Sequence, residues 1–282
     1  MDKKLKKLID EQASHINERL YQGSLERAKS LKAKAHSKPG LVGREYATTA
    51  SATARLSKSL FMVAAAKGPC VEGIQEFVSG MLTTFVADQT ERLNDAYYYE
   101  AIKDEFLVNH WLLALYFGYQ KAEVFYREKL KAFLAEPLEN SQFSFPEQYD
   151  PIYFAFVHNM LASVDNQQLT LVQPGFAYDE FFSQQVPLDA LQKLMDIHVQ
   201  RASKGKGAKD PLEYNPWTAF PLEVLAWYRV AQLAGVEVKL DDSYASQYIQ
   251  VPFELKITNK DCLHLLGDVS ELIGFDVVER YL

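Results

Sequence analysis

The apolar residues between positions 105 and 135 recur at helical spacing, and this pattern constrains the fold more than any other feature of the sequence. A stripe of this kind is stable only when another element covers it. Pro137 follows directly and cannot continue a helix. The pattern predicts one long amphipathic helix, packed against other helices, whose apolar stripe consists of Leu112, Leu115, Tyr119, Ala122, Phe125 and Phe133.

Proline and glycine mark the boundaries of further helices in the N-terminal part of the chain. Residues 3–35 carry apolar side chains at helical spacing between charged ones, and Pro39-Gly40 ends that segment. The alanine-rich stretch 44–66 allows close helix–helix approach and stops at Gly68-Pro69. A further helix is predicted from about residue 71 to about residue 102.

Three prolines predict helix starts in the C-terminal part. Asp150-Pro151 combines an N-cap with a proline in the first turn, and predicts a helix to about residue 162. Pro187 predicts a helix with Leu188, Leu191 and Met195 on one face. Pro221 opens another helix, with Gly235 as the residue after its end and with Leu222, Leu225, Val230 and Leu233 on its inner face.

Strand signals are few. Leu169, Leu171 and Val172 could form a short extended piece, and Val236, Val238 and Leu240 alternate with charged residues. The sequence therefore predicts an all-α protein, an irregular multi-helix bundle with at most one or two short strands. A solenoid-like arrangement stays open, although no fixed repeat period is found. We expect one helical domain over 1–282, with central helices in 44–135 and a C-terminal helical part in 150–282.

Composition restricts the classes of partner. The chain has 30 Lys and Arg and 37 Asp and Glu, a net charge of −7. This acidic balance disfavours nucleic acid as a partner and suits a basic protein. The polar N-terminal residues do not resemble a signal peptide, and no apolar run reaches the roughly 20 residues of a membrane span. We expect a cytoplasmic protein without a membrane partner, in which Cys70 and Cys262 are free thiols.

Common catalytic signatures are absent from the sequence. It contains no Gly-x-Ser-x-Gly, His-Glu-x-x-His or Cys-x-x-Cys motif, and its 6 histidines are scattered. Asp261-x-x-His264 is a single pair, whereas a metal site needs roughly three or four ligands. The sequence therefore predicts no catalytic residue, no metal and no cofactor, and indicates that the protein is not an enzyme. The alternative is an enzyme whose polar side chains converge from several helices.

One acidic cluster is a candidate partner-binding surface. Asp88, Glu91 and Asp95 lie at i, i+3 and i+7 on a predicted helix, and Tyr98 and Tyr99 follow. Tyrosines beside carboxylates suit protein recognition, because each ring supplies contact area and a hydrogen bond. The alternative interpretation is a solvated helix face followed by core tyrosines. The acidic pair at positions 241 and 242 adds two further candidates, Asp241 and Asp242.

Stretch 215–244 carries a family resemblance. It contains Asn215-Pro216-Trp217-Thr218-Ala219-Phe220-Pro221-Leu222, then Leu233-Ala234-Gly235-Val236, then Asp241-Asp242-Ser243-Tyr244. This resembles the C-terminal part of bacterial immunity proteins of the immunity protein 49 family, with its Pro-Leu helix start, its glycine-ended helix and its Ser-Tyr element. The alanine-rich early region and the Trp-x-x-Ala-Leu segment at Trp111 are also similar.

The resemblance implies a cytosolic antidote. Proteins of that family bind a cognate toxin and block it, which protects the producing cell. It assigns no functional residues to numbered positions here. The competing hypothesis is a helical adaptor or scaffold of the α-solenoid type that binds a peptide or protein. The oligomeric state is left open.

Overall fold

The computed structural model describes residues 3–14, 26, 30, 65, 104–118, 120–135, 151–183, 185–203, 218–240 and 244–249. The chain divides into two compact units, Met1–Leu8 with Asp104–Val251 and Ile9–Lys103 with Pro252–Leu282. Most described residues belong to the first unit, to which the following account is confined. The single domain over 1–282 stays a prediction. The helices predicted near 44–66 and 71–102, and both cysteines, lie almost wholly outside the described residues.

Most of the described residues are helical, which confirms the all-α prediction. No strand occurs among them, and segment 236–240 has no regular secondary structure. The segment after α8, which contains Leu171 and Val172, is likewise a loop. The helices are α1 (Lys3–Ser14), α5 (Asp104–Phe117), α6 (Gln120–Ala135), α8 (Pro151–Asn166), the 3-10 helix η2 (Asp179–Phe182), α9 (Ala190–Ala202), α10 (Leu222–Leu233) and α11 (Tyr244–Ile249).

The predicted long helix over 105–135 is two helices. α5 ends at Phe117, and Gly118 adopts a left-handed backbone with φ 73°. That conformation is cheap only for glycine and reverses the chain into α6. The prediction of one stripe was therefore wrong, because α5 is buried around its whole circumference from Val108 to Tyr116. On α6 the burial is one-sided, with Ala122, Tyr126 and Leu130 inside.

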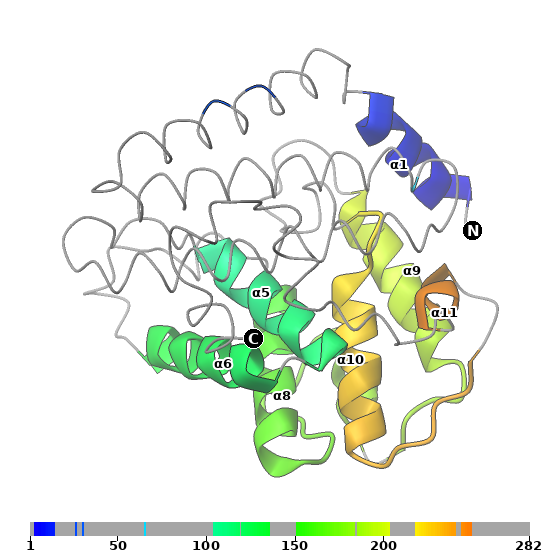
Figure 1. Ribbon diagram of the computed structural model, residues 1–282. Helices are drawn as coiled ribbons and strands as arrows, with labels where there is room; N and C mark the ends of the chain where they lie inside the picture. The colour runs from blue at the N-terminus through cyan, green and yellow to red at the C-terminus, as the bar shows by residue number, and fades with distance from the viewer. Residues whose placement is uncertain are drawn as a thin grey trace. The chain divides into compact units, whose positions relative to one another are not determined.

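Helix α10 is the central element of the first unit. It packs against α5, α8, α9 and α11, while α5 also packs along α6. Figure 1 shows α10, in yellow and orange, between α9 and the end of α5. Residues from Leu222 to Tyr228 are all buried, which suits a helix covered on several sides. The contact between α10 and α5 joins segments far apart in the sequence, as in a bundle.

The starts of α8 and α10 agree with Pro151 and Pro221, whereas α9 begins three residues after Pro187. The boundaries predicted at Pro39-Gly40 and Gly68-Pro69 lie outside the described residues. α8 begins at Pro151 as predicted but runs on to Asn166, and Pro221 directly precedes α10. Leu188 is 79% exposed because it lies in the turn before α9, which begins only at Ala190. Leu233 is 58% exposed in the last turn of α10, beyond the packed surface.

Gly235 ends α10 as predicted. It has φ 70°, its N–H donates to Gln232 O at 3.0 Å, and the N–H of Val236 donates to Ala231 O at 2.8 Å. This paired closure satisfies carbonyls that the last helical turn leaves without partners.

No helix among the described residues is long and apolar enough to cross a membrane.

Candidate functional site

None of the partner-binding residues predicted from the sequence lies in the described part of the chain. Asp88, Glu91, Asp95, Tyr98 and Tyr99 fall between α1 and α5, and Asp241 and Asp242 fall just before α11. Their role stays a prediction. The candidate sites must therefore be built from the polar groups that the first unit buries or fixes.

A histidine and a glutamate are fully buried between α9 and α10. His198 on α9 is 0% exposed and Glu223 on α10 is 1% exposed. The Nδ1 atom of His198 lies 2.6 Å from Oε1 of Glu223, and its Nε2 atom lies 3.1 Å from the carbonyl oxygen of Thr218. A carbonyl oxygen only accepts, so Nε2 must carry a proton. The pair thus links two helices and the turn that precedes α10.

The proton on His198 is stabilised by its surroundings. Burial and the charge of Arg201 lower the pKa of this imidazole, but the charge of Glu223 and the hydrogen bonds to Glu223 and Thr218 O outweigh them, and the pKa is raised. Both ring nitrogens then donate, one to a carboxylate and one to a carbonyl. A general base needs a free ring lone pair that faces a substrate. His198 offers none in this arrangement, so the pair is suited to holding helices together.

Arg201 lies one helical turn beyond His198 and is 2% exposed. Its guanidinium carbon lies 4.7 Å from the ring centre of Tyr153 on α8 and 5.9 Å from that of Tyr178. Its Nη1 atom donates to the hydroxyl of Tyr178 at 3.0 Å. Aromatic faces attract a desolvated guanidinium. Arg201 therefore connects α9 to α8 and to the residue that precedes η2.

Tyrosine hydroxyls form a second buried cluster. Tyr244 and Tyr248 on α11 both donate to the carbonyl oxygen of Ala219, at 2.9 and 3.0 Å, and their hydroxyls lie 2.6 Å apart. Tyr116 at the end of α5 reaches the carbonyl of Tyr248 at 3.4 Å. Burial raises the pKa of Tyr244 to about 12 and raises that of Tyr116 further. These hydroxyls stay protonated and serve as hydrogen-bond donors.

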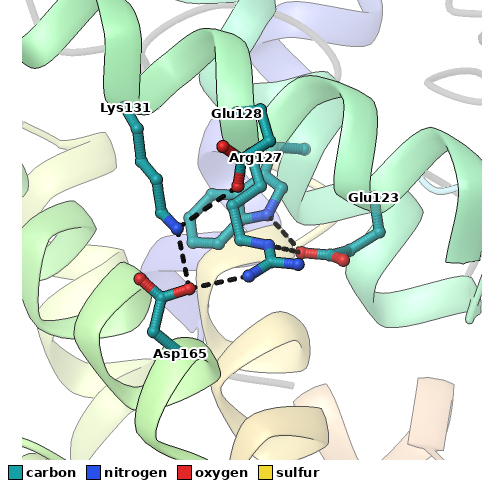
Figure 2. A network of polar contacts seen from close by, with 6 residues as sticks. Glu123, Arg127, Glu128, Lys131 and Asp165 are labelled. Atoms are coloured by element: carbon teal, nitrogen blue, oxygen red, sulfur yellow. Dashed lines mark hydrogen bonds and ion pairs between the residues drawn. The ribbon is translucent and has the colours of Figure 1, made fainter.

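A half-exposed ion-pair network joins α6 to α8 (Figure 2). Oδ1 of Asp165, on α8, lies 2.7 Å from Nη1 of Arg127 and 2.8 Å from Nζ of Lys131, both on α6. Arg127 continues inward to Glu123 at 2.9 Å, and Trp111 Nε1 on α5 donates to the same glutamate at 3.0 Å. Burial opposes ionisation of Asp165, but hydrogen bonds from Lys131 and Arg127 lower its pKa. The network ties three helices together.

The loop that follows α8 is fixed by buried polar side chains. Asn159 is 0% exposed, and its Oδ1 accepts the backbone N–H groups of Val172 and Gln173, both at 2.8 Å. Its Nδ2 donates back to Gln173 O at 3.4 Å. The hydroxyl of Ser163 accepts the N–H of Thr170 at 2.9 Å. Two buried side chains of α8 therefore determine the course of an exposed loop.

The far end of the same loop is fixed by Asp179, the first residue of η2. Its carboxylate accepts the N–H groups of Gly175 at 2.6 Å and of Phe176 at 3.1 Å. Gly175 has φ 97°, a conformation that side chains other than glycine's rarely adopt. The loop is thus held along its length by hydrogen bonds to its own chain.

The sequence left these clusters unrecognised for a physical reason. His198 and Glu223 are separated by 25 positions and meet only because α9 and α10 pack together. A usable signal was present for Asn159, because an amide in the middle of an apolar helix needs a buried partner.

Among the described residues, no group of three or more His, Cys, Asp or Glu is placed to hold a metal. No family model, no curated protein and no solved structure matches this chain.

Proposed function

We propose that this chain is an immunity protein, which binds and neutralises a cognate toxin in the cytosol by forming a tight protein–protein complex. The observation that carries the proposal is the state of the buried ionisable groups. His198, Glu223 and Arg201 are buried, and their hydrogen bonds run to a neighbouring helix, to the hydroxyl of Tyr178 and to the carbonyl of Thr218. A protein with such an interior is suited to holding a fixed surface.

The charge of the chain supports a basic toxin as partner. A net charge of −7 attracts a positively charged protein at long range and raises its association rate. The resemblance of stretch 215–244 to the immunity protein 49 family points in the same direction. The helical adaptor remains the second hypothesis, but α10 packs against α5, a helix distant in sequence. Solenoid repeats contact mainly their neighbours, so this contact favours a bundle over a solenoid in the first unit.

The test takes as candidate toxin the product of the gene adjacent to the one that encodes this chain. Cells that express it should grow only when this chain is co-expressed, and an inactive form of it should bind the purified chain at nanomolar concentration or below. Added salt should slow association more than it speeds dissociation, since steering acts on the encounter. An inactive toxin separates binding from toxicity. If the chain neither rescues the cells nor forms a complex, this function is excluded for that pair of proteins.

A further inference from the structure

Turn 218–220, directly before α10, is fixed through two successive backbone carbonyls. The carbonyl oxygen of Thr218 lies 3.1 Å from Nε2 of His198 on α9. The next carbonyl, that of Ala219, accepts two tyrosine hydroxyls of α11 at 2.9 and 3.0 Å. Thr218 and Ala219 are both 0% exposed. Because neighbouring peptide planes are joined at one Cα atom, a rotation of the first carbonyl is passed to the second.

The two contacts of His198 require two protons. Its Nδ1 atom lies 2.6 Å from Oε1 of Glu223, and its Nε2 atom faces the carbonyl of Thr218. Carboxylate and carbonyl oxygens only accept, so each contact is a hydrogen bond only when a proton lies in it. A neutral imidazole and an ionised carboxylate hold one proton between them. Loss of the second proton therefore brings two lone pairs together in one of the two contacts.

The contact that loses its proton is the one with the turn. A hydrogen bond to a carboxylate is roughly twice as strong as one to a neutral carbonyl, so the remaining proton stays on Nδ1, against Glu223. Nε2 of His198 then presents a lone pair to the carbonyl oxygen of Thr218. Water reaches neither residue, since both are fully buried, and a buried acceptor without a donor is costly. Movement of the turn relieves that cost.

We propose that His198 is a pH-dependent switch for the docking of α11. With a proton on Nε2, it holds turn 218–220 where the carbonyl of Ala219 anchors α11, and loss of that proton releases the turn and undocks the helix. The turn also carries Phe220, whose ring packs edge-on against Tyr248 of α11 with centroids 5.3 Å apart. Movement of the turn thus disturbs polar and apolar contacts of α11 together. This inference concerns contacts within the first unit and does not depend on the proposed function.

The ionisable groups around His198 set the direction of the switch. In the described part of the chain, the charged groups that act on it are Glu223 on α10 and Arg201 on its own helix, and turn 218–220 carries no ionisable side chain. α11 also packs against α9 and brings Tyr244, whose pKa burial raises to about 12. The pKa of His198 is raised, so its proton is lost only above the ordinary histidine value of about 6.5. α11 is therefore docked at low pH and released as pH rises.

The experiment follows the switch by NMR on the full chain, with alanine methyl carbons and histidine ring carbons labelled. Ala219 in the turn and Ala245 on α11 are 0% exposed and report on docking, while Ala226 inside α10 is the internal reference. From about pH 6 to pH 9, the ring of His198 and the methyls of Ala219 and Ala245 should titrate with one midpoint. The ratio of undocked to docked α11 should rise at least about tenfold, which corresponds to a one-unit difference in the pKa of His198 between the two states.

Two matched substitutions of a carboxylate by an amide separate the switch from a loss of stability. Glu223→Gln supplies an amide N–H that can donate to Nδ1, so that a neutral His198 ring keeps its proton on Nε2 and its bond to Thr218 O. α11 should then stay docked across the whole pH range, whereas a merely destabilising change would weaken docking at every pH. Asp165→Asn removes a carboxylate of the α6–α8 network and should leave the transition as it is in the unaltered chain.

Three results would overturn the switch. The first is a titration of His198 to which the methyls of Ala219 and Ala245 do not respond. The second is a His198 ring that stays protonated up to about pH 9. The third is a transition in Glu223→Gln that matches that of the unaltered chain, which would assign it to another ionisable group. If Glu223→Gln does not fold, the unaltered chain decides, and separate midpoints for His198 and Ala245 overturn the proposal.

Discussion

Two sets of ionised side chains hold the first unit together, and they differ in their access to water. The pair His198–Glu223 lies between α9 and α10 with 0% and 1% of its side-chain surface exposed. The network around Asp165 joins α6 to α8, and its outer members are about a third exposed, Lys131 at 34% and Asp165 at 37%. In the first, water reaches neither charge, so each depends on its partner and, for His198, on the carbonyl of Thr218. In the second, water can replace a lost partner.

The comparison teaches that burial decides how much a given contact matters. The shortest contact distances in the two sets are nearly equal, 2.6 Å at His198 and 2.7 Å at Arg127. An exposed pair nevertheless contributes only about 0–1 kcal/mol, whereas breaking a buried pair costs about 3–5 kcal/mol. The α9–α10 contact should therefore be the less tolerant of substitution.

The largest effect is expected from breaking the buried pair on one side. His198→Leu leaves the carboxylate of Glu223 buried without its counter-ion, and should lower the free energy of unfolding by about 3–5 kcal/mol. The double variant His198→Leu/Glu223→Met should recover most of that loss, because both charges are then gone. Urea denaturation of the unaltered chain and both variants measures this. A double variant as unstable as the single one would contradict the role given to the charge.

The second prediction concerns pH. Because the pKa of His198 is raised in the folded state, its contribution to stability is full below the ordinary histidine pKa of about 6.5 and is lost as pH rises through the folded value. The stability advantage of the unaltered chain over Glu223→Gln should therefore narrow as pH rises above about 6.5. Denaturation midpoints across that range provide the measurement. A stability difference between the two proteins that stays constant or widens with pH would contradict a protonated His198 in the folded state.

A smaller effect is expected at the inner end of the α6–α8 network. Trp111→Phe keeps the aromatic packing but removes the N–H that donates to Glu123 at 3.0 Å. Arg127 still pairs with this glutamate, so the loss should be about 1–2 kcal/mol rather than that of an isolated buried charge. The same denaturation measurement tests it, and the double variant with Arg127→Met should lose more than the sum of the two single changes. Simple additivity would show that the two contacts to Glu123 are independent.

The smallest effect is expected at the exposed end. Asp165→Asn should cost about 0.2–1 kcal/mol near neutral pH, and raised salt should reduce that cost. The pKa of Asp165 is lowered, so its contribution is present at neutral pH and disappears as pH falls through the folded value. Denaturation at two salt concentrations and two pH values is sufficient. A loss as large as that of His198→Leu would remove the distinction between the two regions.

Local signals in the sequence predicted the parts of the fold that depend on local chemistry. Pro151 and Pro221 mark the starts of α8 and α10, and Gly235 ends α10, because these residues restrict or permit a backbone conformation by themselves. The break at Gly118 was missed, since the apolar spacing on both sides suggested continuity. The all-α class followed from the spacing and is confirmed by the described helices.

The candidate sites depend on tertiary contacts and were out of reach of such signals. In the sequence, Glu223 is an ordinary acidic residue in the first turn of α10, where the helix dipole stabilises a negative charge. Its contact with His198 exists only because α9 packs against α10. The sequence suggested an extended apolar segment at Leu171 and Val172, but both lie in an exposed loop whose backbone Asn159 holds at Val172 and Gln173. In both cases the contacting residue lies on a different element, and the local spacing of apolar residues does not predict which elements pack together.

The attachment of α11 has a consequence for motion within the first unit. Its six residues are too few to be stable as an isolated helix, so its order depends on what it touches. Tyr244 and Tyr248 place two hydroxyls on one carbonyl, that of Ala219. Opening at that single acceptor breaks both of these hydrogen bonds at once, and leaves the contact of Tyr116 with the carbonyl of Tyr248. The backbone amides of α11 should therefore exchange with deuterium as one group, earlier than those of the buried α10.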